Sequence, residues 1–72
     1  MQLLYTRHAK DRIILRKIKE EWIAGAVARP DKLMDAHDGR VQAIKRINGD
    51  KISVIYKEEE GVIVVITVYW GE

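Results

Sequence analysis

The dipeptide Asn48-Gly49 is the feature that most constrains the fold of this 72-residue chain. A two-residue hairpin turn needs positive φ at both central positions, which asparagine and glycine adopt most readily. Runs rich in β-branched residues flank the pair. We therefore predict a β-hairpin whose strands cover residues 41–47 and 51–57.

This pairing divides the hairpin residues between the two faces of a sheet. The first set is mostly apolar and is predicted to meet the helices, with Lys45 as its one misfit: Val41, Ala43, Lys45, Ile47, Ile52, Val54 and Tyr56. The second set is polar enough to face water or a ligand: Gln42, Ile44, Arg46, Lys51, Ser53, Ile55 and Lys57. An antiparallel sheet with one solvated face has this alternation.

Two further strands and a loop are expected around the hairpin. Residues 62–70 are apolar at nearly every position, which favours a central strand covered on both faces, or nearly so. Residues 58–61 form the turn before it, and residues 31–39 read as a polar loop. If strand 62–70 is central, residues 2–5 can pair along its free edge and close a four-stranded sheet; otherwise the sheet has three strands.

Two short helices precede the sheet strands. Thr6 is placed to cap a helix that begins at Arg7 and ends at residue 16 or 17. Apolar residues at helical spacing predict a second helix over residues 20–28, which Pro30 ends. The fold class is thus α+β: one domain, residues 1–72, with an αα-hairpin packed on a three- to four-stranded antiparallel sheet.

Composition excludes several classes of function. The chain has no cysteine, hence no disulfide, thiolate metal site or cysteine nucleophile. It opens with no signal peptide, and its longest apolar run is too short to span a membrane, so we expect a soluble cytoplasmic protein. No phosphate-binding loop, dinucleotide fingerprint or serine-hydrolase elbow is present, and we expect no cofactor. The group Asp35, His37 and Asp38 has no second cluster to support it, so we predict no metal site.

Basic residues are concentrated near the N-terminus. Residues 1–19 contain a single acid, Asp11, and six basic side chains: Arg7, Lys10, Arg12, Arg16, Lys17 and Lys19. The remaining residues are slightly acidic. This asymmetry indicates an anionic partner, nucleic acid first among them, or simply a solvated helix face.

A family resemblance rests on residues spread along most of the chain. The residues that carry it are His8-Ala9-x-x-Arg12 with Arg16 and Ile18, then Pro30-Asp31, Gly39, and Ile66-Thr67-Val68-Tyr69. Together they resemble a prokaryotic domain-of-unknown-function family, number 4258, which is similar in fold to the BrnT and RelE/ParE toxins. The resemblance implies a RelE-like fold and RNA cleavage, ribosome association or antitoxin binding. Members often have Gly-Ile-Ser/Thr where this chain has Lys17-Ile18-Lys19, so the second helix is expected to be more weakly capped.

The first helix carries the best chemical constellation. His8, Arg12 and Arg16 are spaced four residues apart and share one helix face, with Lys19 close to the same bearing. Metal-independent RNA cleavage needs proton transfer, which His8 could supply, and cations for the phosphorane charge, which the arginines could supply. The alternative is anion binding without catalysis. The polar sheet face adds Arg46, Lys51 and Lys57 as candidates to follow a nucleic-acid backbone.

Three functional hypotheses follow. The first is a toxin-like module that binds RNA, the ribosome or an antitoxin protein through the basic helix and polar sheet face. The second is a metal-independent ribonuclease with His8, Arg12 and Arg16 in its site. The third is a structural interaction domain that self-associates through an exposed edge of strand 41–47 or 51–57.

Overall fold

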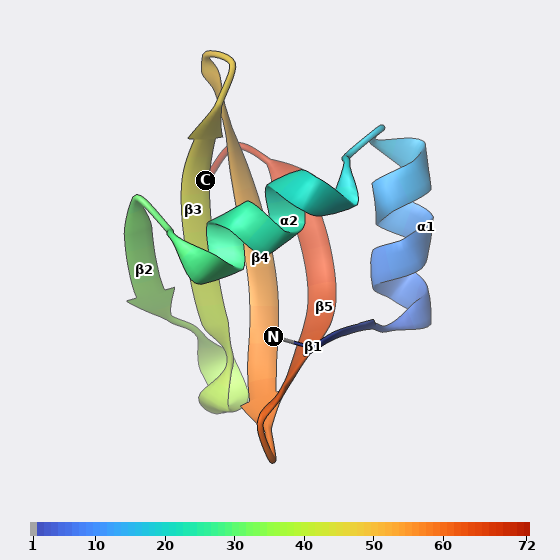
Figure 1. The fold of residues 1–72 in the computed structure, drawn as a ribbon, viewed down its shortest axis with the longest axis vertical. Coiled ribbons are helices and arrows are strands. Elements are labelled where there is room, and N and C mark those ends of the chain that lie inside the picture. Colours follow the sequence, from blue (N-terminus) through green and yellow to red (C-terminus); the bar gives the residue numbers. More distant parts are fainter. Residues whose placement is uncertain (1) are drawn as a thin grey trace.

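The structure, a computed structural model, describes residues 2–72 as two helices and one five-stranded sheet. The strands and helices follow in this order: β1 (Gln2–Tyr5), α1 (Arg7–Leu15), α2 (Glu20–Ala28), β2 (Lys32–Asp35), a short 3₁₀ turn (His37–Gly39), β3 (Val41–Ile47), β4 (Asp50–Glu59) and β5 (Val62–Trp70). Both helices lie on the same side of the sheet, and α2 crosses in front of the central strands in Figure 1. The α+β class is as predicted.

The sheet is mixed, which corrects the predicted three- to four-stranded antiparallel arrangement. Its spatial order is β1-β5-β4-β3-β2. The pairs β2/β3, β3/β4 and β4/β5 are antiparallel, whereas β1 runs parallel to β5, with Gln2 opposite Val62 and Tyr5 opposite Val65. Strand pairing at 2–5 was predicted correctly, but its parallel direction was not. The whole of the intervening chain forms the crossover that a parallel pair requires.

The polar loop predicted for residues 31–39 is the second correction. Lys32–Asp35 forms β2, which pairs with β3 through Leu33 opposite Ala43 and Met34 opposite Gln42. An edge strand forms backbone hydrogen bonds with a neighbour on one side only and buries little apolar surface. Its sequence can therefore be as polar as that of a loop. Since β2 and β5 flank the predicted hairpin, neither β3 nor β4 has a free edge, contrary to the hypothesis of self-association through them.

The central hairpin has the predicted register and faces. Asn48 and Gly49 adopt φ values of 50° and 90°, and Ala43 lies opposite Val54. The core lies between the sheet and the helices and consists of Ala9, Ile18, Ile23, Ala26, Ile52, Val54, Ile63, Val65 and Val68. Lys45, the misfit of this face, passes its aliphatic stem over Gly25 and donates a hydrogen bond from Nζ to the Arg29 carbonyl at 2.9 Å.

The helices do not form a packed hairpin. α1 stands beside β5 and β1 at the sheet edge, while α2 lies across β4 and β3 (Figure 1). Thr6 caps α1 as predicted, since its Oγ1 accepts from the Ala9 N–H at 3.1 Å. Lys19 occupies the N-cap position of α2 without a side-chain cap, as expected from its departure from the family pattern.

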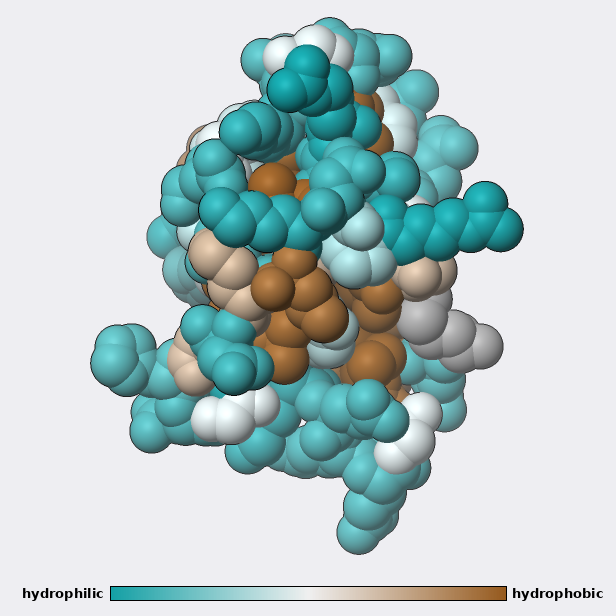
Figure 2. Space-filling view, turned by 90° about the vertical axis from the view of Figure 1, so that its left-hand side faces the viewer, coloured by the Kyte–Doolittle hydropathy of each residue, from teal (hydrophilic) through white to brown (hydrophobic). Residues whose placement is uncertain are grey.

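The edge of the molecule formed by β2 is not uniformly polar. Figure 2 looks at this side and shows apolar side chains gathered in its middle, with hydrophilic ones above and below. Leu33 of β2 is 56% exposed. Within residues 2–72, neither helix is long and apolar enough to cross a membrane.

Candidate nucleic-acid interface

One face of the sheet carries no helix, and we call it the open face. Strand register assigns these polar candidates and their neighbours to it: Lys32, Gln42, Ile44, Arg46, Lys51, Ser53, Ile55, Lys57, Thr67 and Tyr69. It also assigns Gln2, Leu4, Met34, Glu59, Val62 and Val64 to this face. These include the second hairpin set, as predicted. Ile44 and Ser53 are nonetheless buried, so this face is more closely packed than a simple solvated surface.

A β-bulge in β5 brings Thr67 and Tyr69 onto the open face. Tyr56 of β4 lies opposite Val65 and Ile55 lies opposite Thr67, which leaves Ile66 as an extra residue. Such a residue shifts the alternation of side chains between the faces. Val65 and Val68 can therefore both be buried in the core, although they are three residues apart. Before the bulge, Val62 and Val64 lie opposite Glu59 and Lys57, so this part of β5 is apolar on both faces, as predicted.

His8 and Arg12 reach the open face through Thr67. His8 Nε2 lies 3.0 Å from Thr67 Oγ1, and Arg12 Nε donates to the same His8 nitrogen at 3.4 Å. Because the guanidinium can only donate, His8 Nε2 is the acceptor in the contact with Arg12. The helix and sheet candidates thus meet at this edge, with His8 exposed to solvent and Arg12 half-buried.

Arg16, the C-cap residue that follows α1, hydrogen-bonds to the sheet instead of facing a ligand. Its Nη1 donates to the Val68 carbonyl at 2.7 Å, and its own carbonyl accepts from Trp70 Nε1 at 3.0 Å. Thr6 Oγ1 likewise donates to the Ile66 carbonyl at 2.9 Å. Since β1 ends opposite Val65, these side chains satisfy the part of the β5 edge that β1 leaves unpaired. The structure therefore places Arg16 as an edge cap beside His8 and Arg12.

Lys19 does not join this group. Its Nζ lies 5.3 Å from the centre of the Trp22 ring, and Trp22 packs edge-on against Trp70 with ring centroids 5.6 Å apart. The helix on which Lys19 was aligned ends at Leu15, and the chain then turns through Lys17, whose φ is 53°. Lys19 is therefore on the helix side of the sheet.

A polar network crosses the middle of the open face. The Gln42 amide donates to Tyr69 Oη at 3.0 Å and to Ser53 Oγ at 3.2 Å, while Ser53 Oγ donates to the Gly71 carbonyl. Ser53 is fully buried, so these bonds satisfy a hydroxyl that would otherwise be costly to bury. The network fixes Tyr69, the aromatic residue of the open face.

The remaining predicted cations lie at two ends of the open face. Lys51 Nζ pairs with the Glu72 carboxylate at 3.0 Å beside Arg46, and Lys57 pairs with Glu59 at 3.3 Å. The hydrogen bond and charge of Lys51, then the charge of Lys32, hold the pKa of Glu72 below its ordinary value. Among residues 2–72, no three His, Asp or Glu side chains are placed to hold a metal ion.

Sequence reasoning missed Thr67, Lys32 and Glu72 as members of this surface. Thr67 and Tyr69 are the hydroxyl-bearing residues of an otherwise apolar strand, and this contrast could have indicated that they lie on a polar face. Lys32 was placed in a loop. Nothing in the sequence indicated that Glu72 would turn back to the lysines.

Comparison with known proteins supplies a family and no described relative. Neither the curated proteins nor the solved structures contain a match to this chain. A family model, described as a domain of unknown function, DUF4258, matches residues 5–70. This match covers almost the whole chain, and the chain belongs to the DUF4258 family.

Proposed function

We propose that this domain is a RelE/BrnT-like module that binds single-stranded RNA on its open face. The observation that carries the proposal is the contact between His8 of α1 and Thr67 of β5, because it joins the basic helix to the polar sheet face. A strand of RNA laid across the sheet would meet cations at both edges and Tyr69 between them.

The charge distribution supports an anionic ligand on this side. Arg12 lies at one edge of the open face, and Lys32, Arg46, Lys51 and Lys57 lie on it. The acids of the first turn of α2 are on the helix side, and Glu59 and Glu72 on the open face are each paired with lysine. Proteins that bind single strands without base pairing combine such a basic track with aromatic stacking.

Matched charge removals test the proposal. Binding of a fluorescent oligouridine is measured by anisotropy for wild type, Arg12→Ala/Lys51→Ala and Lys10→Ala/Lys19→Ala. Each double variant loses two positive charges, but Lys10 and Lys19 are on the helix side. We expect at least a tenfold loss of affinity in the first variant and less than threefold in the second. Equal losses would contradict a defined interface, and no binding by wild type would direct attention to a protein partner such as an antitoxin.

The His8 geometry favours a second candidate, metal-independent RNA cleavage. Its exposed imidazole lies beside the Arg12 guanidinium, so a group that can transfer a proton stands next to a fixed cation. In this reaction His8 removes the proton from a ribose 2′-hydroxyl, whose oxygen attacks the adjacent phosphorus. Arg12 stabilises the phosphorane charge, and the 5′ oxygen leaves and takes a proton from solvent. The products are a 2′,3′-cyclic phosphate and a 5′-hydroxyl.

Cleavage of a mixed RNA pool in EDTA tests this candidate. Wild type should cleave, and His8→Ala should bind RNA without cleaving it. Thr67→Val should reduce cleavage by about tenfold, since the imidazole loses the hydroxyl that orients it. Cleavage that persists in His8→Ala would contradict this assignment.

A further inference from the structure

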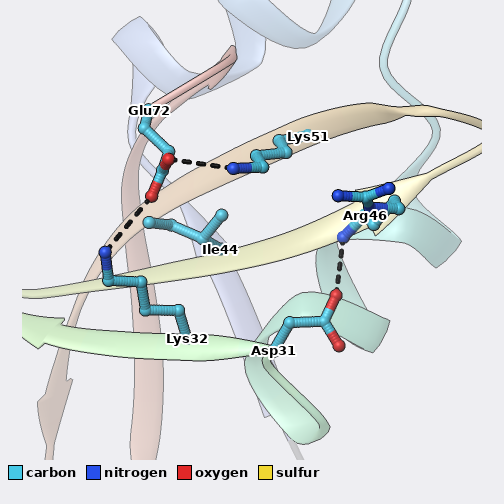
Figure 3. Close-up of a pocket in the computed structure, with 6 residues that line it drawn as sticks. All are labelled: Asp31, Lys32, Ile44, Arg46, Lys51 and Glu72. Atoms are coloured by element: carbon cyan, nitrogen blue, oxygen red, sulfur yellow. Dashed lines mark hydrogen bonds and ion pairs between the residues drawn. The ribbon is translucent and has the colours of Figure 1, made fainter.

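The open face contains a pocket lined by three basic side chains, to which the proposed function assigns no separate role. It has a volume of about 490 Å³ and is lined by residues of β2, β3 and β4, by the residue before β2 and by a residue that follows β5: Asp31, Lys32, Ile44, Arg46, Lys51 and Glu72. Figure 3 shows the side chains of these residues around the hollow, with the Glu72 carboxylate turned towards two lysines. Ile44 is 3% exposed.

The Glu72 carboxylate is held as an anion between two strands. Its Oε2 lies 3.0 Å from Lys51 Nζ on β4, and its Oε1 lies 3.5 Å from Lys32 Nζ on β2. Buried Ser53 donates to the Gly71 carbonyl, and Gly71 adopts a φ of 94° that favours glycine. This anchored turn directs Glu72 onto the sheet face.

The second carboxylate of the pocket does not neutralise its third cation. An Asp31 oxygen accepts from the Arg46 backbone N–H at 2.8 Å. Across residues 2–72 the Arg46 guanidinium forms no ion pair, and in Figure 3 it points away from Asp31. The pocket thus has three cationic side chains and two carboxylates, of which Asp31 is held by a backbone N–H and only Glu72 is paired with the lysines.

The Glu72 ion pairs are of the kind that a ligand can replace. The side chains of Lys32, Lys51 and Glu72 are 59%, 44% and 39% exposed. Pairs this accessible contribute little net free energy because water screens them and the side chains lose freedom. A phosphate group presents the same type of acceptor oxygens, and an arginine can bind it through two N–H groups.

We infer that this pocket is a phosphate subsite that Glu72 occupies in the free protein, so that Glu72 competes with the incoming phosphate. The identity of that phosphate as part of an RNA strand rests on the proposed function. The anion preference of the pocket and the competition by Glu72 do not rest on the proposed function. The pocket and RNA binding can therefore be tested separately.

The test compares two substitutions that remove one negative charge from the same face. Glu72→Gln vacates the pocket, whereas Glu59→Gln breaks the Lys57 pair at the far end of β4. We expect Glu72→Gln to raise the affinity for oligouridine roughly three- to tenfold. Glu59→Gln releases one lysine outside the pocket, whereas Glu72→Gln releases two within it, so Glu59→Gln should raise the affinity by less than about twofold. Equal effects of the two substitutions would overturn the inference while leaving RNA binding intact.

A second measurement keeps the inference testable if RNA does not bind. Inorganic phosphate is titrated into the ¹⁵N-labelled protein at low salt, with sodium chloride at matched ionic strength as the control. We expect phosphate-specific shifts at the amides of Lys32, Arg46 and Lys51, saturating at a lower concentration in Glu72→Gln. If these shifts are seen but RNA does not bind, the proposed RNA-binding function is contradicted and the phosphate subsite is supported. No phosphate-specific shift in either protein would overturn the pocket.

Discussion

Arg12 of α1 and Arg16, the residue that caps its C-terminal end, have different roles. Arg16 donates to the Val68 carbonyl at the β5 edge, whereas Arg12 donates to the exposed His8 ring. Helical spacing placed both on one face correctly, but it could not show that the C-terminal end of α1 lies against β5. That information depends on the parallel β1/β5 pair, which brings residues far apart in the sequence together.

The division between the arginines predicts separate effects on stability and binding. Arg16→Ala should lower the free energy of unfolding by about 1–2 kcal/mol, because the hydrogen bond from a charged donor to Val68 is lost. Arg12→Ala should change it by less than about 0.5 kcal/mol and should weaken RNA binding instead. Urea denaturation and anisotropy measure the two quantities. Equal loss of stability in both variants would contradict the separate roles.

Lys17 has a backbone conformation that suits glycine better than lysine. Its φ is 53°, and the Ile18 N–H donates to the Ile13 carbonyl at 2.9 Å, which forms the hydrogen-bonded end typical of a helix followed by a left-handed residue. Lys17→Gly should raise the stability by about 1 kcal/mol, which corresponds to roughly 4–8 °C in Tm for a domain of this size.

The matched control for Lys17, which follows α1, is an exposed lysine within that helix. Lys10 lies inside α1, where glycine adds backbone freedom to the unfolded chain and stabilises nothing. Lys10→Gly should therefore lower the stability by about 1 kcal/mol. Thermal unfolding of the two variants should give changes of opposite sign, and a decrease in Tm for both would exclude a strained Lys17.

At the scale of elements, the junction between β1 and α1 sets the geometry of the site. The Thr6 N–H donates to the Val65 carbonyl and its hydroxyl to the Ile66 carbonyl, while the same hydroxyl accepts from Ala9. The strand therefore ends, and the helix begins, at the position of the β5 bulge. This coincidence places His8 next to Thr67.

Thr6 provides a test of that junction. Thr6→Ala removes the helix cap and the bond to the bulge, and we expect a loss of about 1–2 kcal/mol in the free energy of unfolding. Thr6→Ser keeps the hydroxyl and should retain most of the stability. Cleavage or RNA binding should fall with Thr6→Ala more than with Thr6→Ser at a temperature where both are folded. Identical behaviour of the two variants would show that the hydroxyl is unimportant.

Elements that follow from local sequence were predicted well. The Asn48-Gly49 turn, helix α2 and strand β5 have the predicted bounds, because turn chemistry and periodicity act over a few residues. The edge strand β2, the parallel direction of β1 and the bulge at Ile66 were not predicted. Each of these depends on which strand lies alongside, and a single strand's sequence carries little of that information.

In the candidate site, too, residues selected by local sequence were predicted and residues placed by contacts between distant segments were not. His8 and Arg12 could be selected from their spacing and chemical type. Thr67 could not, because the bulge decides which face it occupies. The role of Arg16 and the return of Glu72 to Lys32 and Lys51 are both tertiary contacts between distant parts of the sequence.

At the scale of the whole molecule, both sides of the sheet carry basic and acidic groups, and cations outnumber acids on the open face. Its basic residues are Lys32, Arg46, Lys51 and Lys57, with Arg12 at the edge, and its acids are Asp31, Glu59 and Glu72. If RNA crosses the open face, about four phosphates would be neutralised, and the logarithm of the affinity should fall with the logarithm of the salt concentration with a slope of about −3. Arg12→Ala should reduce the size of this slope by about 0.7. A slope near zero would indicate a contact in which phosphate has no part.

Photocrosslinking locates the RNA most directly, because the aromatic residues are divided between the two sides. Tyr69 is on the open face, whereas Tyr5, Trp22 and Tyr56 pack against the core on the helix side. A 4-thiouridine oligonucleotide is crosslinked to the wild-type protein, and the modified peptides are identified by mass spectrometry. We predict crosslinks at Tyr69 and the lysines of the open face, abolished by an excess of unlabelled RNA. Competed crosslinks confined to Trp22 and the α2 side would contradict RNA binding on the open face.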